Sequence, residues 1–163
     1  MQKKEVKKTW YQIEIENDIS DTSGKELIAL LEYLNTIIQI EFIVIDDLDG
    51  AIGELLSYGD NQTVMSFQKF IKAAKPAQQF EWGYFFLFSK KENAEKLILA
   101  IKSKEPTQYD FVDIPDTLTT IRVFDNTSFI IYTSNPKIAE VIRKQYPMVK
   151  IENKDIEQLG FYF

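Results

Sequence analysis

The sequence predicts an α+β protein, in which a mixed or antiparallel sheet carries helices packed on it. Residues 80–88 (FEWGYFFLF) form an aromatic, apolar run between the Pro76 break and the polar residues that begin at Ser89, as expected for a strand buried on both faces. Alternating stretches near 119–125 and 128–133 are joined by DNTS, a hairpin signal. Helical patterns occur between the predicted strands, which favours this class over an all-β fold.

The first part of the chain predicts a strand, a helix and a second strand. Apolar and polar residues alternate over 9–16, which is typical of a half-buried strand. Ser23 and Glu26 have capping-box spacing and precede leucines at helical intervals, so we expect a helix over 24–36. The β-branched run 37–45 predicts a strand, and a right-handed crossover would follow if the two strands are parallel.

The next stretch predicts a turn and two helices. Residues 46–50 (DDLDG) are expected to end the preceding strand in a turn that caps a short helix, which begins near Ile52 and closes at Gly59. A second turn is expected over 59–62. An apolar stripe that includes Phe67 and Phe70 then predicts a helix ending before Pro76.

The second half of the chain predicts the order βαββαβ over 79–152, the arrangement of ferredoxin-like domains. Its first helix follows a capping box at Ser89 and reaches about residue 102, and its second begins at Asn135-Pro136. A last strand is expected over 148–152 and a short helical turn over 155–159. Between the halves of this unit, 109–114 could add a short edge strand.

Length and composition favour one domain, residues 1–163, with possible sub-units 9–75 (βαβ-α) and 79–152 (βαββαβ). The 163 residues are 45% hydrophobic and 27% charged, which is ordinary for a globular protein. The sequence shows no secretory h-region and no membrane-length apolar run, so we expect a cytoplasmic protein that does not bind a membrane. The formal net charge of −6 argues against a nucleic-acid partner.

Histidine and cysteine are absent from the sequence. Their absence excludes Ser-His-Asp and Cys-His catalysis, metal sites with thiolate or histidine ligands, and disulfides. No glycine-rich phosphate loop is present either. We therefore expect no catalytic residues, no metal site and no cofactor.

One motif would allow chemistry without histidine. The strand-like run ending in Asp46-Asp47-Leu48-Asp49-Gly50 resembles the first motif of haloacid-dehalogenase-type phosphatases. The resemblance implies a magnesium-dependent phosphatase, with Asp47 attacking phosphorus and Asp49 protonating the leaving group. The family motif usually continues with threonine or valine where this chain has Ala51. The alternative explanation is a strand that ends in a turn, with aspartates capping the next helix.

Acidic residues also gather in two predicted connections, and these suggest a partner surface. The first set is Asp46, Asp47 and Asp49. The second set, Asp110, Asp113 and Asp116, is interleaved with Tyr109 and Phe111. An acidic rim with aromatic anchors is suited to a basic protein, because opposite potentials speed encounter and buried aromatic side chains slow release.

These observations favour a non-enzymatic, acidic protein that binds another, basic protein. The most concrete form is a small inhibitor or bacterial immunity protein that neutralises a nuclease-like toxin by covering its active site. The phosphatase and an adaptor or structural protein remain the alternatives. The sequence does not specify the oligomeric state.

Overall fold

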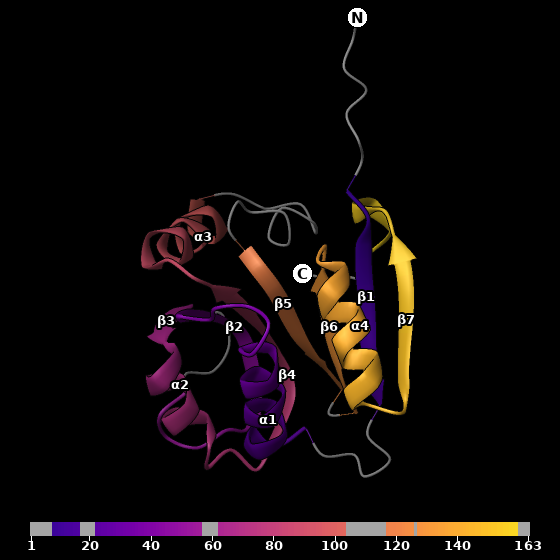
Figure 1. Ribbon diagram of the computed structural model, residues 1–163. Coiled ribbons are helices and arrows are strands. Elements are labelled where there is room, and N and C mark those ends of the chain that lie inside the picture. Colours follow the sequence, from indigo (N-terminus) through magenta and orange to yellow (C-terminus); the bar gives the residue numbers. More distant parts are fainter. Residues whose placement is uncertain (1–7, 17–21, 57–61, 104–116, 126, 160–163) are drawn as a thin grey trace, which may run out of the picture.

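A seven-stranded sheet runs through the protein, with the strand order β3-β2-β4-β5-β6-β1-β7 and every neighbouring pair antiparallel (Figure 1). The computed structural model describes residues 8–16, 22–56, 62–103, 117–125 and 127–159. The elements are β1 (Trp10–Glu16), α1 (Gly24–Leu34), β2 (Phe42–Ala51), β3 (Thr63–Ser66), α2 (Phe67–Ala74), β4 (Gln79–Phe88), α3 (Lys91–Ser103), β5 (Thr117–Phe124), β6 (Ser128–Thr133), α4 (Pro136–Gln145), β7 (Val149–Lys154) and the 3₁₀ turn η1 (Ile156–Gln158). The predicted α+β class is confirmed.

The helices divide between the two faces of the sheet. Helices α1, α2 and α4 lie on one face, in front of the strands in Figure 1, and their buried residues share a core with that face. Helix α3 and η1 contribute to a second core on the opposite face, which we call the α3 face. The sheet therefore buries side chains on both of its faces, so a central strand can be apolar at successive positions.

Strand β4 shows this pattern most clearly. Phe85 and Leu87 enter the core beneath α1 and α2, whereas Tyr84, Phe86 and Phe88 enter the core on the α3 face. All five side chains are at most 3% exposed. The prediction of a strand buried on both faces is confirmed for these five residues, whereas Glu81 and Trp82 are exposed.

The predicted caps of α1 and α4 and the predicted hairpin are also present, whereas α3 begins at Lys91, two residues after the predicted cap Ser89. The Glu26 amide donates to Ser23 Oγ at the start of α1, and the Lys137 amide donates to Asn135 Oδ1 at the start of α4. Asp125 turns the β5–β6 hairpin in the left-handed region, with φ 47°, which aspartate adopts more readily than most residues. Local chemistry therefore specified these boundaries correctly.

Strand β2 departs from the prediction at both ends. The amides of residues 37 and 38 donate to the Leu34 carbonyl, so 37–41 is not strand, and β2 begins at Phe42. The strand then continues through the DDLDG segment, which was wrongly predicted to be a turn. Residues 52–56 are not helical, and β3 was missed. Residues 57–61, and with them most of the expected turn at 59–62, lie outside the described residues.

A β-bulge explains how β2 accommodates its aspartates. The pairing with β4 shifts register between Asp46 and Asp49, and Asp47 has φ 51°. This irregularity leaves Leu48 fully buried while Asp47 and Asp49 stay exposed. A bulge places one extra residue in the strand, so an acidic sequence need not end it.

The strand arrangement corrects two expectations of topology. Residues 79–152 do follow the order βαββαβ, but β4 and β5 pair directly and antiparallel, so the arrangement is not ferredoxin-like. Strands β1 and β2 run parallel but are separated by β6, β5 and β4, so the connection through α1 is a wide crossover and not a compact βαβ unit. Strand β1 instead lies between β6 and β7, so the stretches 9–75 and 79–152 share one sheet. Within the described residues, no helix is long and apolar enough to cross a membrane.

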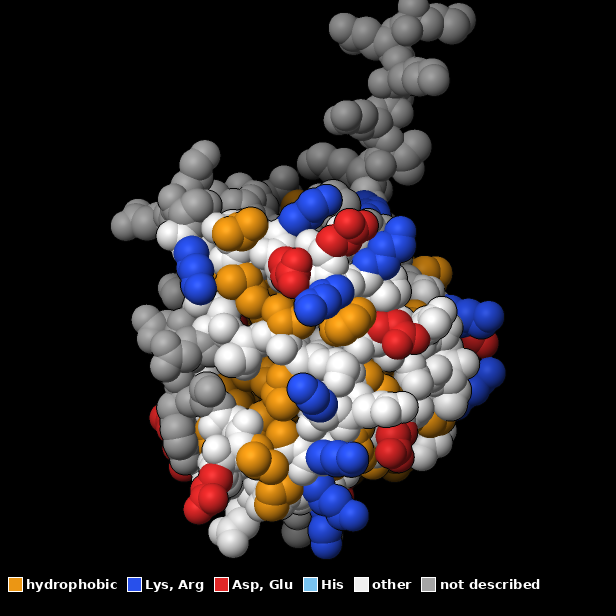
Figure 2. Space-filling view, turned by 90° about the vertical axis from the view of Figure 1, so that its left-hand side faces the viewer, with side chains coloured by type: hydrophobic (Ala, Val, Ile, Leu, Met, Phe, Trp, Pro, Cys, Tyr) orange, Lys and Arg blue, Asp and Glu red, His pale blue; other side chains and the backbone are white. Residues whose placement is uncertain are grey.

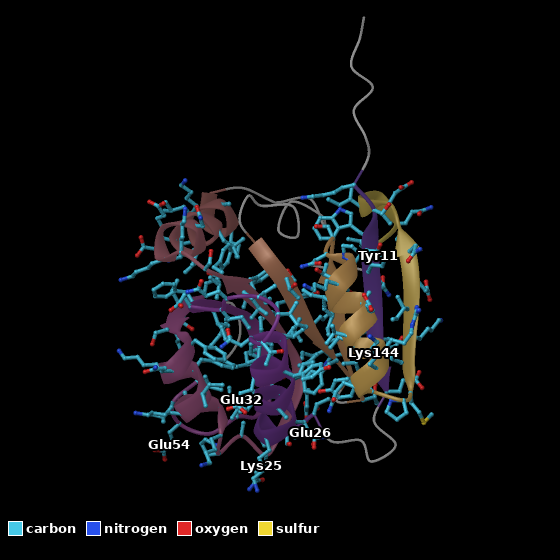
Figure 3. All side chains as sticks on the ribbon, in the orientation of Figure 1. Tyr11, Lys25, Glu26, Glu32, Glu54 and Lys144 are labelled. Atoms are coloured by element: carbon cyan, nitrogen blue, oxygen red, sulfur yellow. The ribbon has the colours of Figure 1, made fainter. Side chains whose placement is uncertain are left out.

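Helix α1 is amphipathic and closely packed at its first residue. Figure 3 shows Lys25, Glu26 and Glu32 on the outer side of this helix, away from the sheet. Gly24 is buried, and its amide donates to the Ala77 carbonyl at 2.9 Å. A Cβ at Gly24 would collide with the carbonyl oxygen of Ala74 at the end of α2. The missing side chain lets the two helices meet.

We predict that Gly24→Ala lowers the free energy of unfolding by about 2–4 kcal/mol, although alanine is the better helix former. The collision is with backbone, so the α1–α2 contact must open. Chemical denaturation measures the change. Lys25→Ala, at the exposed neighbouring position, serves as the control and should stay within about 0.5 kcal/mol of wild type. A stabilised Gly24→Ala protein would contradict the close packing.

Candidate functional site

An exposed aromatic pair lies where β1 and β5 finish and β4 and β6 begin, at the lower end of the sheet in Figure 1. Trp82 is 38% exposed and Phe124 is 37% exposed. Their rings meet edge to face, with centroids 5.2 Å apart. Large aromatic side chains this accessible are unusual beside a core that hides its other rings, and they mark this end as a candidate contact surface.

A buried arginine supports the pair from the α3 face. The Arg122 guanidinium carbon lies 4.9 Å from the Phe124 ring centroid and 5.6 Å from that of Tyr84. Tyr84 stacks in turn with Phe86, at 6.1 Å between centroids. A continuous series of side-chain contacts therefore runs from solvent into the core, through Trp82, Phe124, Arg122 and Tyr84. Such contacts fix the exposed rings before any partner arrives.

Carboxylates surround the aromatic pair. Asp49 is the cross-strand neighbour of Trp82, and Asp125 follows Phe124 in the hairpin turn. Glu16 is opposite Ser128, which is itself opposite Phe124. The carboxylates at this end are those of Glu14, Glu16, Asp46, Asp47, Asp49, Glu81 and Asp125.

Cations are scarce at the same end of the sheet. Within residues 14–16, 46–50, 81–84 and 122–125 the only cation is Arg122, which is 5% exposed. Lys150 lies opposite Glu14 on the neighbouring strand, but its ammonium is bound to Glu152 at 2.9 Å. The aromatic pair therefore has an acidic rim. We call Trp82, Phe124 and these carboxylates the aromatic-acidic end.

Two buried polar side chains, Asp46 and Tyr84, lie between the aromatic-acidic end and the core. Asp46, 7% exposed, accepts a hydrogen bond from Gln62 Nε2 at 2.8 Å. It is the cross-strand neighbour of Tyr84, which is 3% exposed. Burial raises the pKa of Tyr84 to about 12; Arg122 opposes this rise, whereas the charges of Tyr132, Asp47 and Asp46 add to it. The phenol is therefore held neutral well above neutral pH.

The structure brings together one of the two predicted acidic sets. Asp46, Asp47 and Asp49 lie together at the bulge of β2, but Asp46 is buried whereas the other two are exposed. Tyr109, Asp110, Phe111, Asp113 and Asp116, together with the expected edge strand 109–114, lie outside the described residues.

Sequence reasoning missed the aromatic members of the end. Trp82 stands within the strand predicted to be wholly buried, and Phe124 ends a strand of the hairpin. Two local signals were available, since Glu81 precedes the tryptophan and Asp125 follows the phenylalanine. An acidic residue next to an aromatic residue indicates that this end of the strand lies outside the core and is exposed to solvent.

The phosphatase-like motif has a different setting from the one its resemblance implies. Asp47 and Asp49 lie at a bulge inside β2, which has antiparallel neighbours on both sides. Asp49 Oδ1 accepts a hydrogen bond from the Gly50 amide at 2.8 Å. The described residues contain no group of three or more acidic side chains placed to hold a metal ion.

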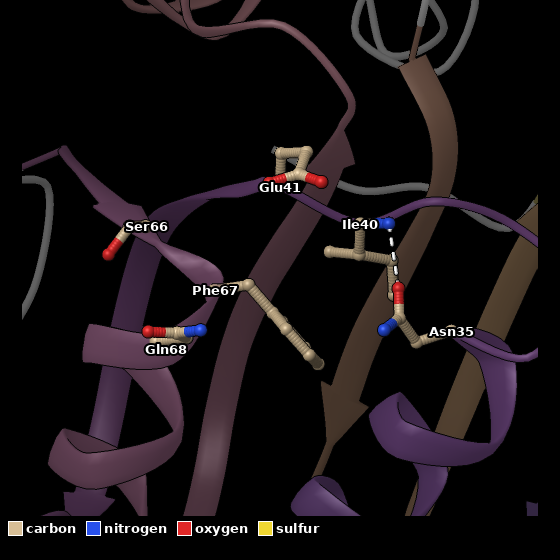
Figure 4. Close-up of a pocket in the computed structure, with 6 residues that line it drawn as sticks. All are labelled: Asn35, Ile40, Glu41, Ser66, Phe67 and Gln68. Atoms are coloured by element: carbon tan, nitrogen blue, oxygen red, sulfur yellow. Dashed lines mark hydrogen bonds between the residues drawn. The ribbon is translucent and has the colours of Figure 1, made fainter.

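A separate hollow of about 390 Å³ opens between the end of α1 and the start of α2 (Figure 4). Its lining residues are Asn35, Ile40, Glu41, Ser66, Phe67 and Gln68. Asn35 Oδ1 accepts a hydrogen bond from the Ile40 amide at 2.8 Å, which fixes one wall. Glu41 is the only ionisable residue in this lining, so the hollow lacks the paired groups that acid-base catalysis uses.

Comparison of the chain with protein-family models, curated proteins and solved structures gave no match. The functional argument therefore rests on the aromatic-acidic end itself.

We predict that the Tyr84 phenol titrates near pH 12 in the folded protein. Because its folded-state pKa exceeds the unfolded value of 10.0, its contribution to stability is complete below pH 10 and is lost as pH rises toward 12. The difference in tyrosinate absorbance between wild type and Tyr84→Phe isolates this group. A difference curve centred at pH 10 would contradict the burial of the phenol.

Proposed function

We propose that the protein is a non-catalytic, acidic protein-binding protein whose aromatic-acidic end docks a basic protein. In its most specific form it is a small inhibitor or bacterial immunity protein, which neutralises a basic, nuclease-like toxin by covering the toxin's active site. The observation that carries this proposal is the exposed Trp82–Phe124 pair, with Asp49 across the strand from Trp82 and Asp125 next to Phe124.

The aromatic pair supplies what a stable contact needs. Tryptophan is among the residues whose loss most weakens protein interfaces, and Trp82 is exposed at this end beside Phe124. Trp82 and Phe124 contact each other and Phe124 contacts Arg122, so little side-chain freedom remains to be lost on binding. Covering both rings would also remove apolar surface from water.

The acidic rim selects the partner by charge. A partner carrying lysine and arginine would meet Asp49, Asp125 and Glu16 around the aromatic pair. The net charge of −6 adds a long-range attraction that raises the association rate at low salt. A nuclease cleft has the complementary chemistry, because it uses cations to hold phosphates. Inhibition by occlusion requires no reactive group of its own.

We predict that Trp82→Ala and Phe124→Ala each weaken the affinity for the partner at least about tenfold. The partner is to be captured at low salt from the native cells and then purified, and titration calorimetry measures the dissociation constant. Leu99→Ala is the matched control, because Leu99 is 66% exposed on α3, away from this end, and should leave the affinity unchanged.

The charge dependence gives an independent readout of the same complex. Asp49→Asn combined with Asp125→Asn should lower the association rate and flatten its decrease with salt, because two rim charges are lost. Wild-type affinity in all these variants, or no basic partner from cells that express one, would contradict the proposal.

We also predict no magnesium-dependent hydrolysis of an aryl phosphate, because the proposed binding function uses no nucleophile. The measurement compares wild type with Asp47→Asn, the residue that the phosphatase motif would make the nucleophile. Hydrolysis that requires magnesium and disappears in this variant would replace the binding proposal with the phosphatase.

A further inference from the structure

The two edges of the sheet differ in their chemistry. Edge strand β7 carries Lys150, Glu152 and Lys154, with Glu152 bound to both lysines at 2.9 and 3.2 Å. Charged side chains of this kind discourage another strand from pairing with an edge. Strand β3, at the opposite edge, has the sequence TVMS, with no charge and no proline, and within the described residues it pairs only with β2.

A small hollow lies beside β3. It measures about 190 Å³ and is lined by Phe42, Val64, Met65, Ser66, Lys69 and Lys91. Figure 2 shows this side of the molecule, where hydrophobic side chains gather in a hollowed strip and lysine or arginine side chains stand around it. All four β3 residues are only partly buried. The β3 side chains are therefore partly exposed within the described residues, and an apolar recess lies next to them.

The two charged residues that line this recess are both lysines, although Glu41 precedes Phe42 and Glu95 lies near Lys91. Lys69 in α2 and Lys91 at the start of α3 are both exposed. Helix α2 has no acidic residue from Phe67 to Ala74. Lys91 meets Glu95 only at 3.9 Å, with both side chains more than half exposed, so it can turn to another carboxylate at little cost.

We propose that the β3 edge binds an extended acidic peptide segment of a partner protein by strand addition. Every second residue of an edge strand points its N–H and C=O outward, and these groups would pair with the added strand. An apolar side chain of the segment enters the recess at Phe42 and Val64. Carboxylates of the segment meet Lys69 and Lys91.

Charge distinguishes this occupant from a second copy of the chain. Two copies pairing through β3 would bring the Lys69 and Lys91 side chains of both copies to the same edge, where they repel one another. An acidic segment turns the same lysines into an attraction. This surface also differs in sign from the aromatic-acidic end, so the two surfaces select different partners.

The test uses an acetylated, amidated peptide of alternating leucine and glutamate, added to the full chain. Binding should slow amide hydrogen exchange over Thr63–Ser66 and leave the exchange of β7 unchanged, and labelled peptide gives the dissociation constant by anisotropy. The double variant Lys69→Glu/Lys91→Glu should bind about tenfold more weakly, because two attractions become repulsions. Lys25→Glu/Lys137→Glu, which makes the same charge change at exposed helix starts, should bind nearly as wild type.

Three results would overturn the inference. The first is exchange at Thr63–Ser66 that the peptide does not slow. The second is equal binding of a peptide with lysine in place of glutamate, or equal binding by Lys69→Glu/Lys91→Glu. The third is a dimer in sedimentation that Val64→Lys dissociates, since a second copy would then occupy the edge. Trp82→Ala should leave peptide binding intact, which separates this site from the aromatic-acidic end.

Discussion

The burial of β4 on both faces is the constraint on which the rest of the structure depends. A strand between two apolar layers needs a hydrogen-bonded neighbour on each side, and β2 and β5 are those neighbours, with a bulge in the pairing to β2. Gly83 lies close to the bulge of β2, since a Cβ there would lie 2.7 Å from Leu48 Cδ1. The glycine thus leaves room for the Leu48 side chain between the exposed Asp47 and Asp49.

The same strand connects the fold to the proposed contact surface. Tyr84 is 3% exposed and Trp82, two residues earlier on the same face, is 38% exposed. Most of the aromatic run in β4 is buried in the core, but the run also includes the exposed Trp82, which lies outside the core. Arg122 and Phe124 follow the same course on β5, so the core holds the exposed rings in place from below. A rigid contact surface results without any loop having to present it.

Sequence reasoning located elements well where a local signal decides them. The caps at Ser23 and Asn135, the hairpin and the doubly buried β4 all follow from residues near one another in the chain. It failed at residues 46–51, where local turn propensity favoured a loop but pairing with β4 made a bulged strand. It also could not place β1 between β6 and β7, because strand neighbours depend on distant packing. The acids of β2 were found, but the exposure of Trp82 depends on where the core ends.

The position of β1 also determines the order in which the fold can be completed. Glu14 of β1 and Ser128 of β6 contact each other although they are 114 positions apart in the chain. Strand β7 joins the sheet only through β1. During synthesis β1 must therefore remain without β6 and β7 until the residues between them have been made. Closing so long a loop slows folding. Strand β1 is thus open to unwanted pairing during that interval, and the alternation of Gln12, Glu14 and Glu16 along it keeps one of its faces polar.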